Sequence, residues 1–178
     1  MNQLPFLNSC HRVQGLSRVH LVEAGKEPWG GKEKLVGSKA AGKSYEKALV
    51  RSLLKKKLPQ DTHVLYNTWL EFWDTSGHHY AQPDILITSP TSVICLECKL
   101  TQTPFAFDQL WYLYKPLMET LWPKRKIALA QVCKNLRVHP GEGLAYSITE
   151  ALEKQYWREE GLNLPPIPTI HCHGDIEI

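Results

Sequence analysis

Two short patterns in the middle of the chain carry residues that could bind a metal ion. The first is the dipeptide Pro83-Asp84, and the second, after twelve intervening residues, is the tripeptide Glu97-Cys98-Lys99. Each pattern occurs once in the sequence. Hard divalent cations such as Mg²⁺ prefer oxygen ligands and usually keep several waters beside one or two carboxylates. Asp84 and Glu97 are therefore candidate ligands, and a metal-bound water is a candidate nucleophile.

The setting of Glu97 and Lys99 strengthens this interpretation. They lie near the end of "VICLECKL", a run that is apolar apart from these two residues and that predicts a central strand covered on both faces. Side chains alternate along a strand, so Glu97 and Lys99 should point to one side, together with Val93 and Cys95. A buried, unpaired charge there would cost several kcal/mol. The pair therefore needs partners, and a metal ion together with Asp84 on a neighbouring strand would supply them.

A third acid, Glu46, lies on the apolar stripe of the helix predicted over "GKSYEKALVRSLLKKKL", residues 42–58. This stripe should face the sheet, so Glu46 is expected to support the other two carboxylates. Basic residues recur every fourth position beside that stripe and are suited to phosphate contact: Lys43, Lys47, Arg51 and Lys55. Ser44 is the expected N-cap, and Pro59 ends the helix.

The remaining elements follow from hydrophobic periodicity. "HVLYNTWLEFW" (63–73) and "AQPDILIT" (81–88) predict two antiparallel strands around the turn "TSGHHY". After the strand at 93–100, a helix is expected over 103–122, kinked or shifted by Pro116, followed by a strand at 126–133. The order helix, three strands, helix, strand predicts an α/β fold with a mixed sheet. A third helix is expected within 143–161, and the proline-broken end predicts a tail or an edge strand.

Glu46 on a leading helix, Pro83-Asp84, and Glu97-x-Lys99 on the next strand together resemble the PD-(D/E)XK nuclease superfamily over residues 42–133. The resemblance implies a restriction-endonuclease-like αβββαβ core with a central mixed sheet flanked by helices. With it we assign residues 1–40 to an N-terminal arm, 41–160 to the nuclease domain and 161–178 to a C-terminal tail.

The resemblance also implies roles. Asp84, Glu97 and the main-chain carbonyl of Cys98, with Glu46 as an additional candidate, would bind Mg²⁺ or Mn²⁺. Lys99 would orient or help to deprotonate the attacking water. Gln109 resembles the glutamine of the RecB-like and λ-exonuclease-like branches, although Leu113 stands where the RecB-like pattern has tyrosine. "GKSYEKALV" is similar to the opening of archaeal Holliday junction resolvases, so the branch stays undecided.

The implied function is metal-assisted hydrolysis of DNA phosphodiester bonds in recombination, repair or phage DNA processing. The expected partner is DNA, with no NTP and no membrane. Resolvase-like relatives act as pairs, so the resemblance also allows a homodimer. The sequence leaves endo- or exonucleolytic cleavage, the DNA structure that is cut, and activity on RNA open.

Two other functions compete with this interpretation. "GSKAAGKS", Gly37–Ser44, matches the phosphate-binding loop pattern G-x-x-x-x-G-K-[ST] and would predict a nucleotide-binding protein. However, such a loop should leave a buried apolar strand, and only Leu35 and Val36 precede it. The second alternative is a non-catalytic DNA-binding protein that keeps the nuclease fold.

Composition limits the kinds of binding surface, cellular location and metal site that we expect. The formal net charge is only +3, so a nucleic-acid surface requires local clustering of basic residues. Five scattered cysteines and no recognisable leader favour a reducing, cytoplasmic location, including that of a phage protein in a bacterial or archaeal host. Cys95 and Cys98 should face opposite sides of their strand, which argues against a shared zinc ion. His78 and His79, in a predicted turn, are expected to be solvated.

Overall fold

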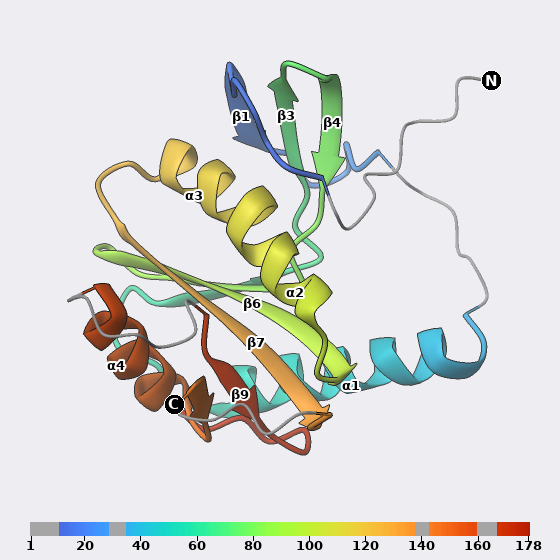
Figure 1. Ribbon diagram of the computed structural model, residues 1–178, viewed down its shortest axis with the longest axis vertical. Coiled ribbons are helices and arrows are strands. Elements are labelled where there is room, and N and C mark those ends of the chain that lie inside the picture. The colour runs from blue at the N-terminus through green and yellow to red at the C-terminus, as the bar shows by residue number, and fades with distance from the viewer. Residues whose placement is uncertain (1–10, 29–34, 138–142, 160–166) are drawn as a thin grey trace.

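The computed structural model describes residues 11–28, 35–137, 143–159 and 167–178, with the backbone alone for 155–159 (Figure 1). The described strands are β1 Arg18–Leu21, β2 His63–Tyr66, β3 Leu70–Asp74, β4 Gly77–Ala81, β5 Ile85–Thr88, β6 Ser92–Thr101, β7 Lys126–Asn135, β8 Leu144–Ala145 and β9 Thr169–His171. The described helices are α1 Gly37–Lys55, α2 Pro104–Asp108, the π-helical η1 Gln109–Tyr114, α3 Lys115–Leu121 and α4 Ile148–Glu159. None of the described helices is long and apolar enough to cross a membrane.

The main sheet has six strands in the order β2-β5-β6-β7-β9-β8. β5 is antiparallel to both β2 and β6, whereas β6, β7, β9 and β8 pair in parallel. The α/β class and the mixed sheet are thus as predicted. β6 occupies an interior position, which explains why its sequence is apolar on both faces.

Each face of the main sheet carries its own core, and each core is covered by helices (Figure 1). On one face Leu49 and Leu53 of α1 pack with Leu96 of β6 in a cluster that extends to α4. On the other face Leu110 and Leu117 of the helical segment α2–η1–α3 pack in a cluster that includes residues of β5, β6 and β7. The two faces of β6 therefore contact different helices, and Cys95 and Cys98 belong to opposite faces as predicted.

A second, three-stranded sheet of order β1-β3-β4 packs against the outer side of the α2–η1–α3 segment (Figure 1). This sheet corrects two predictions. Residues 18–21, within the segment assigned to an N-terminal arm, form β1, and the two strands predicted at 63–73 and 81–88 are four strands divided between two sheets. Asn67, with a φ of 53°, marks the bend between β2 and β3, and Pro83 lies between β4 and β5. The chain leaves and re-enters the main sheet at these two breaks.

Helix α1 begins at Gly37, seven residues before the predicted N-cap Ser44. Val36 is the N-cap residue, and Ser44 lies inside the helix. This corrects the predicted start. Residues Gly37–Ser44 therefore form the first two turns of a helix rather than a loop that could wrap around phosphates.

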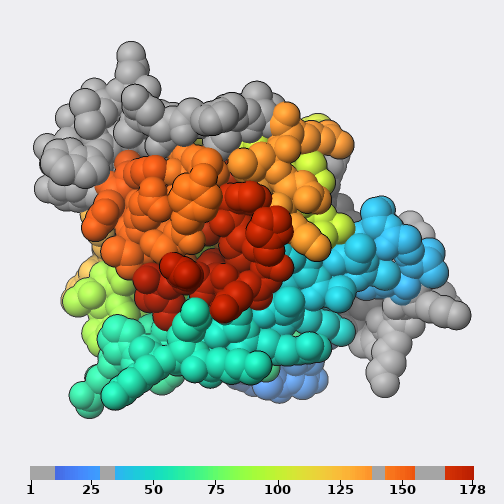
Figure 2. Space-filling view, turned by 90° about the horizontal axis from the view of Figure 1, so that it is seen from below, coloured from blue at the N-terminus to red at the C-terminus, as the bar shows by residue number. Residues whose placement is uncertain are grey.

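The C-terminal residues are also more integrated than predicted. β9 is an interior strand between β7 and β8, rather than a tail or an edge strand. After it the chain runs along α1, as Figure 2 shows for the red segment beside the cyan and teal helix. Tyr45 Oη donates to the Cys172 carbonyl over 2.8 Å, and Ser52 Oγ donates to Asp175 over 2.6 Å. The described part of the C-terminus is thus tied to the leading helix.

Candidate active site

Glu97 and Lys99 lie near the C-terminal end of β6, on the face covered by α2–η1–α3, as the strand alternation predicted. Only 2% of the Glu97 side chain is exposed, and Lys99 is partly buried. Lys99 Nζ donates to Glu97 Oε1 over 2.5 Å. The second carboxylate oxygen of Glu97, Oε2, is buried without a hydrogen-bond partner. Only one of the two oxygens of the Glu97 carboxylate is therefore hydrogen-bonded. An unpaired buried carboxylate oxygen is costly.

Asp84 is brought to this pair by the end of the β5–β6 ladder. The ladder pairs Ile85 with Leu96, and continuing that register would place Pro83 opposite Cys98. Proline has no N–H and cannot extend the ladder. The Asp84 carboxylate instead accepts the Cys98 N–H over 2.7 Å. Because the N–H and C=O of one strand residue point the same way, the Cys98 carbonyl is directed toward the Asp84 side of β6.

Glu46 reaches the same region from α1. Its side chain is 12% exposed and accepts a hydrogen bond from Lys43 Nζ over 2.6 Å. Repulsion from Glu46 raises the pKa of both Asp84 and Glu97, which places the three carboxylates in one electrostatic group. The structure thus brings together Glu46, Asp84 and the Glu97–Lys99 pair, which come from three separate segments of the sequence.

The electrostatics of this group are those of crowded acids. Burial, followed by repulsion from Glu46, raises the pKa of Asp84 to about 6. Burial and repulsion from Asp84 raise the pKa of Glu97 to about 8, in spite of Lys99. Burial lowers the pKa of Lys99, but attraction to Glu97, the hydrogen bond to Glu97 and attraction to Asp84 together outweigh it, and the net shift is upward. The protein alone does not fully compensate these carboxylates, so a cation beside them would be stabilised.

This crowding predicts a pH dependence of stability in metal-free protein. The pKa of Glu97 is raised from 4.5 to about 8 by folding, so its contribution to stability is complete below pH 4.5 and is lost as the pH rises toward 8. Between these values the free energy of unfolding in EDTA should fall by a few kcal/mol more for the wild type than for Glu97→Gln. Urea unfolding at several pH values measures the difference between the two profiles. Parallel profiles would contradict this account of Glu97.

Gln109 is connected to the site through a tyrosine. Its Nε2 donates to Tyr114 Oη over 3.1 Å, and that hydroxyl donates to the Gln82 carbonyl over 2.8 Å. Both residues lie in η1, and single π-helical turns are frequent at functional sites. Pro116 follows in the first turn of α3, so the predicted irregularity of this helix is confirmed. The carboxylates of Glu97 and Asp84 raise the pKa of the buried Tyr114, after burial itself. Gln109 thus helps to fix the segment that enters Pro83-Asp84.

The sequence analysis missed Gln131, which is buried next to Glu97 in the parallel pairing of β6 and β7. Its Oε1 accepts the Thr103 N–H over 2.9 Å, and its Nε2 donates to the Thr103 carbonyl over 3.0 Å. Gln131 therefore holds the start of α2, which leads directly into η1 and its first residue, Gln109. The only signal in the sequence is a glutamine within the apolar run "KIALAQVC".

Most of the basic row on α1 is exposed. Lys47, Arg51 and Lys55 are exposed, whereas Lys43 is paired with Glu46. Lys43 also lowers the pKa of Asp84, so the row begins at the carboxylates and continues along the helix. This geometry suits a strand of nucleic acid that passes the acids and follows α1.

A different group of side chains has its possible metal-ligand atoms close together. Within the described ranges, the one set of three His, Cys, Asp or Glu side chains with donor atoms all within 4.8 Å is His11, Asp74 and His79. Glu46, Asp84 and Glu97 do not form such a set. The prediction that His79 is solvated is wrong, because it lies in β4 and is 8% exposed.

Comparison with known proteins adds no assignment: no family model, no curated protein and no solved structure matches the chain.

Proposed function

We propose that this protein is a metal-dependent DNA nuclease of the PD-(D/E)XK type, with Asp84, Glu97 and Lys99 at its catalytic centre. The observation that carries the proposal is the buried, unpartnered Oε2 of Glu97 in a group of mutually repelling carboxylates. A structural ion pair would use both oxygens of a buried carboxylate. A site that binds a cation instead leaves oxygen atoms available for it.

The residues fit Mg²⁺ or Mn²⁺. The donor set consists of oxygens only, from Asp84, Glu97, the Cys98 carbonyl and, further out, Glu46, and hard cations prefer such a set. The nearby cysteine thiols do not compete for these ions, since burial raises the pKa of Cys95 and Cys98 well above its usual range. The charge of a single divalent ion, together with the Lys99 ammonium, would balance the negative charge of the carboxylates.

The element order offers independent support. Leaving out the inserted β3 and β4, the elements around the main sheet run α1, β2, β5, β6, α2–η1–α3 and β7. This is the order αβββαβ that the resemblance implies. Asp84 directly precedes β5, and Glu97 lies on the neighbouring strand β6, near the point at which the ladder of these two strands ends.

Each side chain then has a task. When bound, a divalent ion would lower the pKa of a bound water and stabilise the charge that develops on the phosphate. Asp84 and Glu97 would hold the ion, and the Lys99 ammonium would orient the water and the phosphate. The hydrogen bonds of Tyr114 to Gln82 and of Gln131 to Thr103 tie the covering helical segment to the strands, and Gln109 donates to the Tyr114 hydroxyl.

DNA is the proposed partner, with Lys47, Arg51 and Lys55 contacting its phosphates. We place this activity in phage DNA processing, recombination or repair inside a bacterial or archaeal cell, with a pair of chains as an alternative to a monomer. The nucleotide-binding alternative is not favoured, because Gly37–Ser44 is helical.

The test is to incubate purified protein with labelled linear, circular, single-stranded and four-way-junction DNA in Mg²⁺, Mn²⁺ or EDTA. We expect cleavage of at least one substrate that requires the metal and is abolished by EDTA. DNA binding without cleavage in either metal would contradict the proposal and favour a non-catalytic DNA-binding protein. The pattern of products distinguishes endo- from exonucleolytic action.

A further inference from the structure

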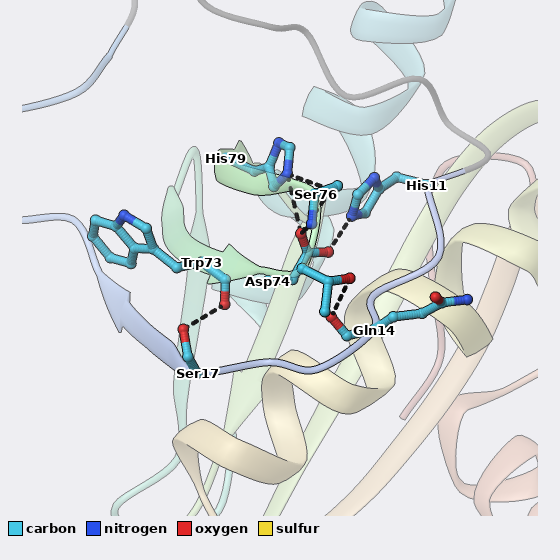
Figure 3. Close-up of polar contacts among 8 residues, drawn as sticks. His11, Gln14, Ser17, Trp73, Asp74, Ser76 and His79 are labelled. Carbon is cyan, nitrogen blue, oxygen red and sulfur yellow. Dashed lines mark hydrogen bonds and ion pairs between the residues drawn. The ribbon is translucent and has the colours of Figure 1, made fainter.

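A second cluster of ligand-type side chains lies in the three-stranded sheet, apart from the carboxylates of β5 and β6. Figure 3 shows its members: His11 from the segment that precedes β1, Asp74 at the end of β3, and His79 on β4. His11 Nε2 lies 2.7 Å from Asp74 Oδ2, and His79 Nε2 lies 3.3 Å from Asp74 Oδ1. Two imidazoles and a carboxylate thus converge from three chain segments.

The cluster is buried and oriented like a set of metal ligands. The side chains of Asp74, His11 and His79 are 1%, 15% and 10% exposed. Ser76 fixes the carboxylate, because its backbone N–H and its hydroxyl both donate to Asp74 Oδ1, over 2.8 and 2.7 Å (Figure 3). Such outer hydrogen bonds orient a ligating carboxylate, and the other oxygen, Oδ2, faces His11 Nε2.

One buried atom of the cluster has no role in the protein alone. The Nδ1 atom of His79 lacks a hydrogen-bond partner. Either nitrogen of an imidazole can ligate a metal, and in His79 the nitrogen that faces Asp74 is Nε2, which also contacts Ser76 Oγ over 2.8 Å. Ligands at about 2.0–2.2 Å from a zinc ion lie about 3.3 Å from one another. Donor atoms that already lie within 4.8 Å of one another need only small side-chain movements to reach that spacing.

We propose that His11, Asp74 and His79 form a binding site for one divalent transition-metal ion of the zinc class. Mixed imidazole and carboxylate ligands favour such ions over Mg²⁺. The burial of all three ligands leaves little access for a substrate, so the role of the ion is structural. It fastens the segment that precedes β1 to the β3–β4 hairpin, where Thr75 N–H already donates to the Gln14 carbonyl over 2.9 Å. This site does not depend on the proposed nuclease function.

The test uses full-length protein stripped with EDTA and then loaded with Zn²⁺ or with Co²⁺ as a spectroscopic substitute. We expect one Zn²⁺ per chain after dialysis, a rise in melting temperature on adding Zn²⁺, and visible Co²⁺ bands without a thiolate band. His79→Ala and His11→Ala should each weaken Zn²⁺ binding by at least about 100-fold. The matched control is His78→Ala, whose imidazole points to the other face of β4 and contacts Glu71.

Three outcomes would overturn this site: no retained Zn²⁺ in the wild type, equal Zn²⁺ binding by His79→Ala, or a cobalt–thiolate band showing cysteine ligands. The wild-type measurements decide the question even if a variant fails to fold. Asp84→Asn should retain the Zn²⁺, which separates this site from the nuclease site. Loss of DNA cleavage with unchanged Zn²⁺ content would therefore count against neither the zinc site nor its ligands.

Discussion

Glu97→Gln should reduce metal-dependent DNA cleavage by at least about 1000-fold. The substitution keeps the shape of the side chain but removes the charge that holds the cation. In EDTA at pH 8 the variant should also be more stable than the wild type, because it no longer buries a carboxylate whose second oxygen is unpartnered. Cleavage rates on the best substrate and urea unfolding of both proteins measure the two effects.

The combination of lost cleavage and increased stability is diagnostic, because a carboxylate with only a structural role would behave differently. If Glu97 served only to pair with Lys99, its neutralisation would destabilise the fold. Glu119→Gln is the matched control, since Glu119 is exposed and pairs with Lys115 on the surface of α3. It should change neither cleavage nor stability appreciably. A Glu97→Gln protein that cleaves DNA at the wild-type rate would refute the assigned site.

Lys99→Met should lower cleavage by about 100-fold or more while leaving Mn²⁺ binding in place. Methionine fills most of the space of the lysine stem but carries no ammonium, so the water and the phosphate lose one positive contact. In metal-free protein the variant should be less stable at pH 8, because ionised Glu97 then loses its hydrogen-bond donor. Single-turnover cleavage and urea unfolding measure these changes.

Lys26→Met provides the control for this variant, since Lys26 is exposed and pairs with Glu23 far from the site. It should cleave DNA at the wild-type rate. If Lys99→Met cleaved as fast as Lys26→Met, the amine would be a structural partner of Glu97 only. The proposed chemistry would then lack its second positive group.

The sequence was sufficient to predict that these side chains approach one another, because short-range patterns position each of them. Alternation along a single strand places Glu97 and Lys99 on one side, and Pro83 ends the neighbouring ladder where Asp84 can reach β6. Helical periodicity placed Glu46 on the face of α1 that meets the sheet. These patterns extend over a few residues and need no knowledge of distant pairings.

The features that escaped prediction depend on non-local contacts. The strands β3 and β4 look like continuations of β2 and β5, and only pairing with β1 separates them into a second sheet. β9 is three residues long and is buried only because β7 and β8 lie on either side of it. The approach of His11 to Asp74 likewise joins segments 63 residues apart. Short-range periodicity carries no information on such partners.

The most direct test of the central claim is an electron paramagnetic resonance titration of Mn²⁺ with EDTA-treated protein. Bound Mn²⁺ loses the sharp spectrum of the free ion, so the titration counts sites and gives their affinity. We predict that the wild type and His79→Ala bind Mn²⁺ alike, and that Asp84→Asn binds it at least about 10-fold more weakly. Equal Mn²⁺ binding by wild type and Asp84→Asn, or none by either, would contradict the account.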